Sequence, residues 1–195
     1  MRSGAYQRST KETAVEVALT LEGSGRAEVR TAVKFFDHML AQWCFHGRLD
    51  VSIDARSFDG IKHHLVEDVA LAVGAALDRA LGERIAIARY GAALIPMDEA
   101  LARVAVDFSG RPFAKTSLRT AAASIEDLEV DLVPHFFSSF AQTARMAIHA
   151  DVLAGENGHH CVEALFKAAG VACAQAWRLD EHAGDRVPST KGTLG

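Results

Sequence analysis

The chain has 195 residues, enough for one large domain or two small fused units with a sizeable buried core. Its hydrophobic content of 49% and charged content of 24% are ordinary for a globular protein, and the formal net charge of -4 excludes a general attraction to nucleic acid. No stretch has the uninterrupted apolar length that a secretory signal or a membrane span requires. We therefore expect a cytoplasmic protein that binds neither nucleic acid nor membranes.

The first half of the chain predicts two strands, a helix, a strand and a helix. Polar and apolar residues alternate over 12–23 and 25–33, and the Gly-Ser-Gly between them predicts that these two strands form a hairpin. Residues 34–46 have the spacing of an amphipathic helix, 49–56 that of a strand, and 63–81 that of a second helix closed by Gly82.

The second half predicts the same order after a seam at 82–89. Residues 100–110 and 111–118 predict a strand pair around a Ser-Gly-Arg-Pro turn, followed by a helix at about 133–145, a strand at 146–155 and a helix at 159–177. Such a repeat indicates an α+β fold with helices on one face of each sheet. We expect residues 1–195 to form a single domain of two repeats, about 8–86 and 87–178, which pack helix to helix or share one core.

A motif with two adjacent histidines supports this duplication. His63, His64 and Glu67 are followed by Gly74, and the same residues return at a constant offset as His159, His160, Glu163 and Gly170. A single histidine precedes each motif by a similar interval, His38 in the first half and His135 in the second. Duplication of a unit of about 90 residues is the simplest explanation.

Helix geometry suggests what these side chains bind. Residues four apart share a helix face, so His63 and Glu67 can meet at one point, whereas adjacent histidines point in different directions and suit two different metal ions. Six histidines and two glutamates divide into two sites, each with three His, one Glu and open positions for water or substrate. Such donors favour Mn, Fe, Zn or Ni over Mg or Ca, and the absence of thiolates disfavours structural zinc. A lone histidine usually has a structural role, and we expect this of the three outside the set, His46, His149 and His182.

The chain resembles a known family over most of its length. The segments FFDHML, HHLVED, RYGAALIPMDEAL, VDFSGRP, HFFSSF, GHHCVEALFKA and VPSTKGTL stand in the order and spacing of imidazoleglycerol-phosphate dehydratases, from about Arg8 to Leu194. The resemblance implies halves like ribosomal protein S5 domain 2, two Mn²⁺ per active site, and a 24-subunit homo-oligomer whose subunits share active sites. No redox step is needed and no Gly-rich dinucleotide loop is present, so no nucleotide cofactor is expected.

The resemblance also implies a reaction and its residues. The expected reaction is the dehydration of D-erythro-imidazole glycerol phosphate to imidazole acetol phosphate in histidine biosynthesis, through a metal-bound imidazolate and a diazafulvene-like intermediate. Glu12 matches the acid/base residue and Gln42 a substrate contact. The matching metal ligands are His38, His63, His64, Glu67, His135, His159, His160 and Glu163. The phosphate site maps onto Arg89, Arg111, Lys167, Ser189 and Lys191, which gives the polar tail, 179–195, a function.

Four positions depart from the family pattern. Lys62 and Gly158 stand where an aspartate usually precedes each histidine pair, Leu65 replaces a threonine, and Cys161 replaces a lysine. Carboxylates beside metal-binding histidines orient the rings, and their loss typically weakens metal affinity by about 10- to 100-fold. Two other functions therefore stay open. One is a divergent enzyme acting on another azole or polyol phosphate. The other is a metal-dependent assembly protein without catalysis, which the retained base and phosphate residues disfavour.

Overall fold

The computed structural model describes residues 1–120 and 122–194. The first half contains β1 (Ser3–Ser9), β2 (Thr13–Thr20), β3 (Ala27–Arg30), α1 (Lys34–Gly47), β4 (Asp50–Ser57) and α2 (Lys62–Leu81). The second contains β5 (Tyr90–Met97), β6 (Ala100–Asp107), β7 (Phe113–Ser117), a short hairpin of β8 (Ser124–Ile125) and β9 (Leu128–Glu129), α3 (Leu132–Ala144), β10 (Ala147–Ala154) and α4 (Gly158–Trp177). No helix among these residues is long and apolar enough to cross a membrane.

Each half builds one four-stranded sheet, and the two sheets share a topology. The strand orders are β1-β2-β4-β3 and β5-β6-β10-β7. In both sheets the first three strands are antiparallel neighbours, and the last strand runs parallel to the one beside it. The predicted α+β fold with an internal duplication is confirmed.

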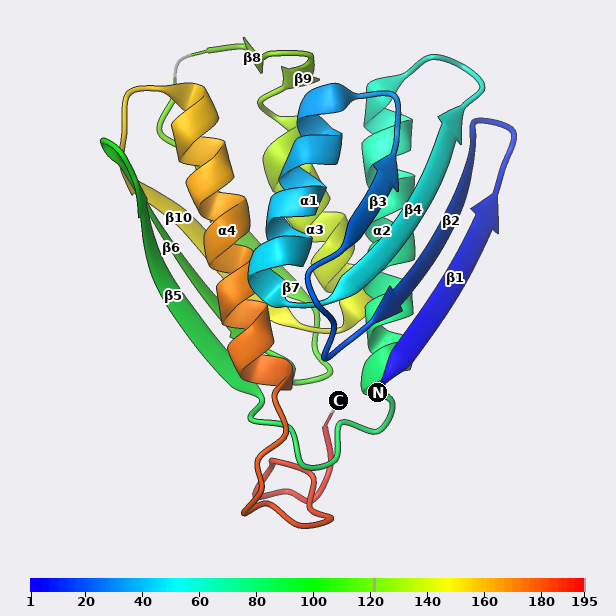
Figure 1. The fold of residues 1–195 in the computed structure, drawn as a ribbon, viewed down its shortest axis with the longest axis vertical. Helices are drawn as coiled ribbons and strands as arrows, with labels where there is room; N and C mark the ends of the chain where they lie inside the picture. Colours follow the sequence, from blue (N-terminus) through cyan, green and yellow to red (C-terminus); the bar gives the residue numbers. More distant parts are fainter. Residues whose placement is uncertain (121, 195) are drawn as a thin grey trace.

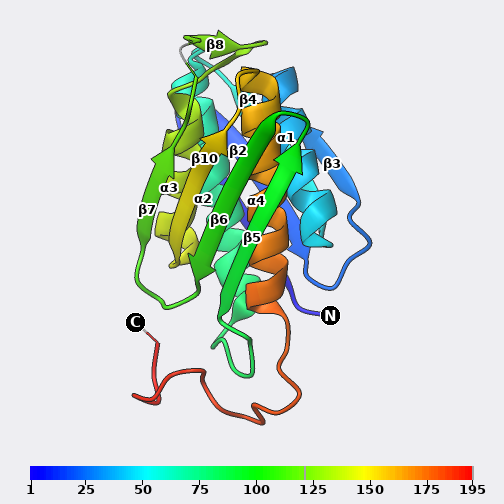
Figure 2. The ribbon, with the colours of Figure 1, turned by 90° about the vertical axis from the view of Figure 1, so that its left-hand side faces the viewer.

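The four helices lie between the two sheets (Figures 1 and 2). α2 packs on β1 and β2, and α4 packs on β5 and β6, so each sheet has helices on one face. The halves meet helix to helix, α1 against α4 and α2 against α3, around one continuous hydrophobic core. Phenylalanines of different helices join there: Phe36 lies 5.5 Å from Phe136, and Phe137 lies 5.1 Å from Phe166, between ring centroids.

The two predicted strand pairings are wrong. β2 and β3 do not form a hairpin, because β4 lies between them, and β10 likewise separates β6 from β7. The hairpin partner of β2 is β1, and that of β6 is β5. The sequence pattern did not reveal β1 or β5. Helix α1 connects β3 to β4, and such a crossover joins parallel neighbours, so β2 is left to pair on the other edge of β4. The Gly-Ser-Gly loop is held instead by Asp50, whose Oδ1 accepts backbone N–H bonds from Ser24 and Arg26 at 2.8 and 2.9 Å.

All three cysteines, Cys44, Cys161 and Cys173, are buried and unpaired. Burial raises the pKa of both Cys44 and Cys173 to about 12, so these thiols stay protonated near neutral pH. Leu65 is buried as well, with 3% of its surface exposed. Two of the four departures from the family pattern, Leu65 and Cys161, are therefore core residues that present no new polar group at the surface.

The repeated glycine marks where helices cross closely. A Cβ atom at Gly74 of α2 would lie 2.5 Å from the carbonyl oxygen of Phe140 in α3, and one at Gly170 of α4 would lie 2.5 Å from that of Trp43 in α1. Real Cβ atoms do not approach backbone this closely. Each half therefore needs a glycine at the same place for its second helix to reach the facing helix.

We expect Gly74→Ala to lower the free energy of unfolding by about 1–3 kcal/mol, because the added methyl group must push α2 and α3 apart. Chemical denaturation of the purified variant measures this loss. Ala75→Ser is a matched control, because it adds one heavy atom at the next, half-buried position of α2. Equal stability of Gly74→Ala and the wild type would show that α2 and α3 have room for a methyl group at this crossing.

Candidate metal centres and active site

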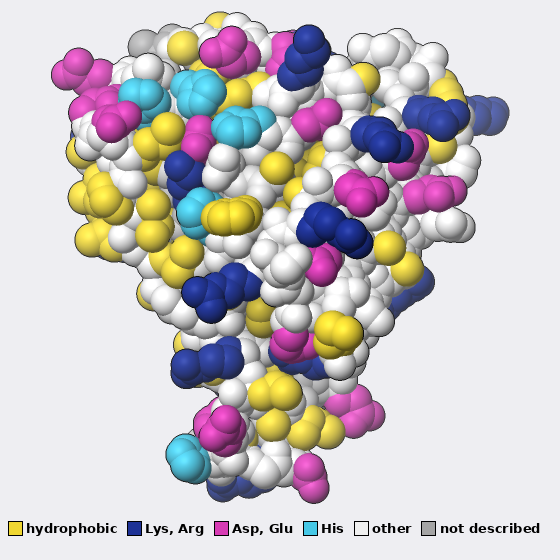
Figure 3. All heavy atoms as spheres, in the orientation of Figure 1, with side chains coloured by type: hydrophobic (Ala, Val, Ile, Leu, Met, Phe, Trp, Pro, Cys, Tyr) yellow, Lys and Arg dark blue, Asp and Glu magenta, His cyan; other side chains and the backbone are white. Residues whose placement is uncertain are grey.

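The predicted histidines gather because all four helices begin at the same end of the molecule (Figure 1). His63 and His64 lie in the first turn of α2, His159 and His160 in that of α4, and His135 in that of α3. Several histidine side chains are grouped on this part of the surface in Figure 3. Helix N-termini carry partial positive charge, so a cation site here requires carboxylates as well.

The first cluster joins α1 to α4. Nε2 of His38 and Nε2 of His159 each lie 3.0 Å from the same oxygen, Oε2 of Glu163. Glu163 is buried, and its other oxygen, Oε1, lies 2.7 Å from Nζ of Lys167. Burial alone would raise the pKa of Glu163, but the hydrogen bonds from Lys167 and His38 outweigh it and lower the pKa to about 2. This carboxylate is therefore ionised and accepts only.

The second cluster joins α2 to α3. Ligand atoms of His63, Glu67 and His135 all lie within 4.8 Å of one another, and the two imidazole rings stack with centroids 4.2 Å apart. Nε2 of His135 is buried, 3.9 Å from Oε2 of Glu67, and has no hydrogen-bond partner within the described part of the chain. A buried nitrogen without a partner is costly. A metal ion bound to its lone pair would satisfy it, so the donor set fits a metal.

Each cluster crosses the boundary between the halves, and each contains two histidines and one glutamate. The prediction of three histidines per site is not met within one chain, because neighbouring residues on a helix point to different sides. The second histidine of each motif, His64 or His160, turns away from the clusters. Nδ1 of His64 lies 2.7 Å from Oδ2 of Asp59, and Nδ1 of His160 lies 2.8 Å from Oε2 of Glu99.

Both carboxylates beside these outer histidines are strongly acidic. The backbone N–H of Ile61, followed by the ring of His64, lowers the pKa of Asp59 to about 2. The ring of His160, followed by the backbone N–H of Asn157, lowers the pKa of Glu99 to about 2. Conversely, these bonds raise the pKa of both histidines. The repeated motif contains neither Asp59 nor Glu99, so it did not predict their contacts with the histidines.

Glu12, the predicted base, lies in the turn between β1 and β2, with Oε2 3.6 Å from Nδ1 of His64. The turn is anchored on both sides. The backbone N–H of Glu12 donates to Oγ1 of Thr10 at 3.1 Å, and the buried Thr13 donates its hydroxyl to Asp68 of α2. Asp68 was not predicted; it also accepts from Nε of Arg8 at 2.6 Å. Gln42, half-buried on α1, lies one turn after His38.

Lys62, the departure beside the first histidine pair, contacts the β8–β9 hairpin. Its Nζ donates to the backbone carbonyl of Asp127 at 2.6 Å and lies 3.1 Å from Oε1 of Glu129. The Asp127 carboxylate accepts from the backbone N–H groups of Lys34 and Phe35 and so caps α1. The lysine therefore ties α2 to the start of α1, and its charge is compensated outside both clusters.

The predicted phosphate residues divide between two places. Arg89 is bonded to Asp107 at 2.7 Å and to the carbonyl oxygen of Pro188 at 2.8 Å, which puts it next to Ser189 in the tail. The tail is hydrogen-bonded to the seam, as shown by Asp180 N–H donating to Ala86 O at 2.7 Å. This region lies at the end opposite to the helix starts (Figure 1). Arg111 is exposed in the loop after β6, and Lys191 is exposed in a turn of the tail, whereas Lys167 lies on α4 beside the first cluster.

A 20-residue helix such as α2 is roughly 30 Å long. One chain therefore brings together the metal clusters and the base, but leaves the tail residues of the predicted phosphate site at the other end. No small substrate spans that distance.

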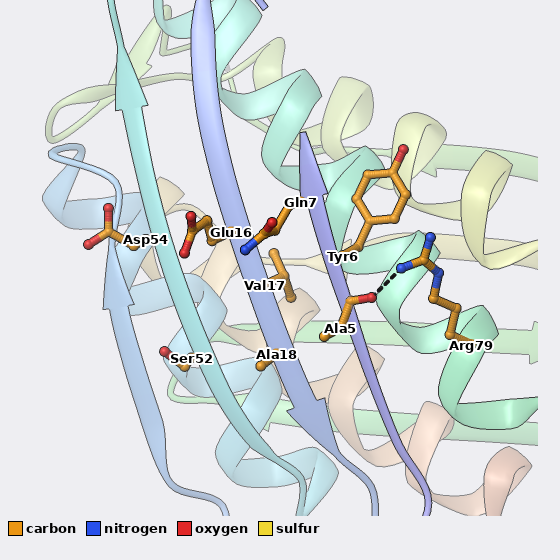
Figure 4. A pocket seen from close by; sticks show the side chains of 9 residues that line it. All are labelled: Ala5, Tyr6, Gln7, Glu16, Val17, Ala18, Ser52, Asp54 and Arg79. Carbon is orange, nitrogen blue, oxygen red and sulfur yellow. Dashed lines mark hydrogen bonds between the residues drawn. The ribbon is translucent and has the colours of Figure 1, made fainter. Parts of the chain in front are cut away.

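Two hollows elsewhere contain none of the predicted site residues. One, of about 510 Å³, lies on the outer face of the first sheet between Glu16, Asp54 and Arg79, the last of which donates to the carbonyl of Ala5 (Figure 4). The other, of about 860 Å³, lies at the ends of α1 and α4 against Phe45 and Trp177. Neither is the candidate site.

Comparison with known proteins agrees with these features. Residues 31–173 match the family model of imidazoleglycerol-phosphate dehydratase. The imidazoleglycerol-phosphate dehydratase of Methanopyrus kandleri is 48% identical over 198 residues, covering 100% of this chain and 97% of the relative. That of Chloroflexus aggregans is 45% identical over 194 residues, covering 99% of this chain and 95% of the relative.

The fold agrees as well. The crystal structure of IGPD from Pyrococcus furiosus in complex with (S)-C348 matches with a TM-score of 0.85 at 38% identity, covering 97% of this chain and 100% of that one. Family model, full-length relatives and structure all point the same way. The chain therefore belongs to the imidazoleglycerol-phosphate dehydratase family of hydro-lyases.

Proposed function

We propose that this chain dehydrates imidazole glycerol phosphate to imidazole acetol phosphate in histidine biosynthesis. The observation that carries the proposal is the pair of His-His-Glu clusters at one end of a chain of this family. One contains an ionised Glu163, and the other contains a His135 nitrogen that has no hydrogen-bond partner among the described residues. Two cation sites at the same end of the chain suit a substrate ring with two nitrogens.

The residues that would hold the metals are His38, His159 and Glu163 for one ion, and His63, Glu67 and His135 for the other. Imidazole and carboxylate donors suit Mn²⁺, and we propose two Mn²⁺ per active site. When bound, the ions would supply Lewis acidity to the nitrogens of the imidazole ring. Gln42, one turn from His38 on α1, would contact the bound substrate.

Glu12 would move the proton. Dehydration removes a hydroxyl from the carbon next to the ring and a proton from the following carbon. Glu12 stands on a short turn anchored at Thr10 and Thr13, at the same end as the clusters, so its carboxylate is held ready to accept that proton. The hydroxyl leaves as water, and the remaining enol converts to the ketone.

Apart from Lys167, which lies beside the first cluster, the phosphate site would come from a different chain than the metal clusters. Arg89 and Ser189 lie at the far end of each chain, so only an assembly can place them beside the clusters of a neighbour. His64 and His160, which point away from their own clusters, would supply the third histidine to clusters of neighbouring chains. Both features support a homo-oligomer with shared active sites, for which we propose 24 subunits.

Mixed assemblies test this sharing. We expect Glu12→Gln to be nearly inactive alone, and a tail variant with Ser189→Ala and Lys191→Ala to be nearly inactive alone. When the two chains are co-expressed and co-purified, some sites combine an intact base with an intact tail, so part of the activity should return. Activity of the mixture no higher than the sum of its parts would contradict the shared site.

The proposed reaction itself can be tested in cells. Expression of the chain in a histidine auxotroph that lacks this dehydratase should restore growth without histidine, and Glu12→Gln expressed to the same level should not. Failure of the well-expressed wild type to restore growth would contradict the proposal and favour a divergent substrate.

A further inference from the structure

We infer that Asp59 and Glu99 are positioning residues that hold the outer histidines of the two pairs, His64 and His160. Each accepts a hydrogen bond from Nδ1 of an outer histidine, His64 or His160, and so leaves Nε2 of that ring available to bind a metal. The inference rests on the metal sites proposed above and concerns how two of their ligands are held.

The two carboxylates make the same pair of contacts. One oxygen of Asp59 accepts from the backbone N–H of Ile61, the residue that precedes α2, at 2.9 Å, while the other lies 2.7 Å from Nδ1 of His64. One oxygen of Glu99 accepts from the backbone N–H of Asn157, the N-cap of α4, at 2.9 Å, while the other lies 2.8 Å from Nδ1 of His160. Each carboxylate thus bridges the start of a helix and the histidine in its first turn.

These matching contacts come from unrelated positions in the chain. Asp59 belongs to the loop between β4 and α2, where the second half has Gly155. Glu99 belongs to the turn between β5 and β6, where the first half has Glu12. The same arrangement reached from two different positions is hard to explain as a by-product of the duplication. It indicates that both helices require a carboxylate on the outer histidine.

The contact determines which ring nitrogen carries the proton. Each carboxyl group already accepts a backbone N–H at one oxygen and turns its other oxygen to the ring, so Nδ1 of each histidine is the donor. In the neutral ring the lone pair is then on Nε2, the nitrogen that makes no hydrogen bond within the described residues. A carboxylate on the other nitrogen is the usual partner of a metal-bound histidine, and it fixes both tautomer and ring direction.

The arrangement also separates the roles of two equivalent glutamates. In the second half, Glu99 of the hairpin turn holds the histidine directly. In the first half, Asp59 holds His64 at 2.7 Å, and Glu12 of the equivalent turn stands farther away, at 3.6 Å. Among the described residues, Asp59 therefore takes the hydrogen bond of His64 and leaves the Glu12 carboxylate without one from this ring.

The test compares Glu99→Ala and Asp59→Ala with the wild type, the second in a Glu12→Gln background so that Glu12 cannot take the place of Asp59. In metal-free protein with ¹⁵N-labelled histidine, solid-state NMR should show that the Nδ1–H tautomer of the affected ring is lost. In Mn²⁺ titrations of the intact assembly, affinity at one of the two classes of site should fall by about 10- to 100-fold. Asp98→Asn removes the same charge from a carboxylate that lies 3.8 Å from Nδ1 of His160 without a hydrogen bond to it, so it should leave the tautomer in place.

Glu99→Gln keeps the length of the side chain and one acceptor oxygen, and is expected to lie between the wild type and Glu99→Ala in both readouts. It also serves if the alanine variant does not fold. An unchanged tautomer together with Mn²⁺ affinity within twofold of the wild type would overturn the inference. If the wild type bound no Mn²⁺, the proposed metal sites would fail, whereas the tautomer comparison in metal-free protein would still decide the positioning role.

Discussion

Glu12→Gln is expected to lower kcat by about 10²- to 10⁴-fold, the usual contribution of a general base, without loss of bound metal. The amide keeps the shape of the side chain but cannot accept the proton. The anchoring contacts of the turn use the backbone of Glu12 and the side chains of Thr10 and Thr13, so the substitution leaves them in place. Steady-state kinetics with imidazole glycerol phosphate, alongside elemental analysis for metal, measure both effects.

Glu16→Gln is the matched control, because it makes the same change on the exposed face of β2, beside the hollow of Figure 4. Its kcat should equal that of the wild type. A Glu12→Gln enzyme with more than a tenth of wild-type kcat would exclude Glu12 as the base. A variant that lost metal as well as activity would instead assign Glu12 to the metal site through His64.

Glu67→Gln and Glu163→Gln are each expected to remove one of the two metal ions per chain and to lower kcat by roughly 10³-fold or more, since a Lewis-acidic ion contributes several kcal/mol to such a reaction. Each amide retains one oxygen but loses the charge that offsets a cation near the helix N-termini. Elemental analysis of the purified assemblies should give about half the metal of the wild type in each variant.

Glu156→Gln controls for the change of charge, because this exposed residue precedes α4 and belongs to neither cluster. In the metal-free protein, Glu163→Gln should lower the free energy of unfolding more than Glu67→Gln does, because it leaves Lys167 without its ionised partner at 2.7 Å. Full activity or full metal content in either variant would remove that glutamate from the assignment.

The helices, and the proximity of each glutamate to a histidine of its own motif, could be predicted from the sequence because both depend on local spacing. His63 with Glu67, and His159 with Glu163, are four residues apart on a helix, and that spacing alone places them on one face. The contacts of Gly74 and Gly170 likewise explain why a glycine recurs at the same distance after each motif.

The sequence did not predict which strands lie side by side or which side chains meet through the tertiary structure. Alternation identified β2 and β6 as strands, but it carries no information on which strand lies beside them. Asp59, Glu99 and Asp68 make their contacts through tertiary structure, and no periodic pattern marks them. The same is true of Lys62, whose contact with the β8–β9 hairpin no local pattern predicts.

The most direct test of the function is a turnover assay on the wild-type assembly. Metal-free protein should be reconstituted with Mn²⁺, offered imidazole glycerol phosphate, and assayed for imidazole acetol phosphate. We expect the ketone to form only after metal is added, and Glu12→Gln to slow its formation by about 10²- to 10⁴-fold. No ketone from a folded protein with two Mn²⁺ bound per chain would contradict the proposed reaction.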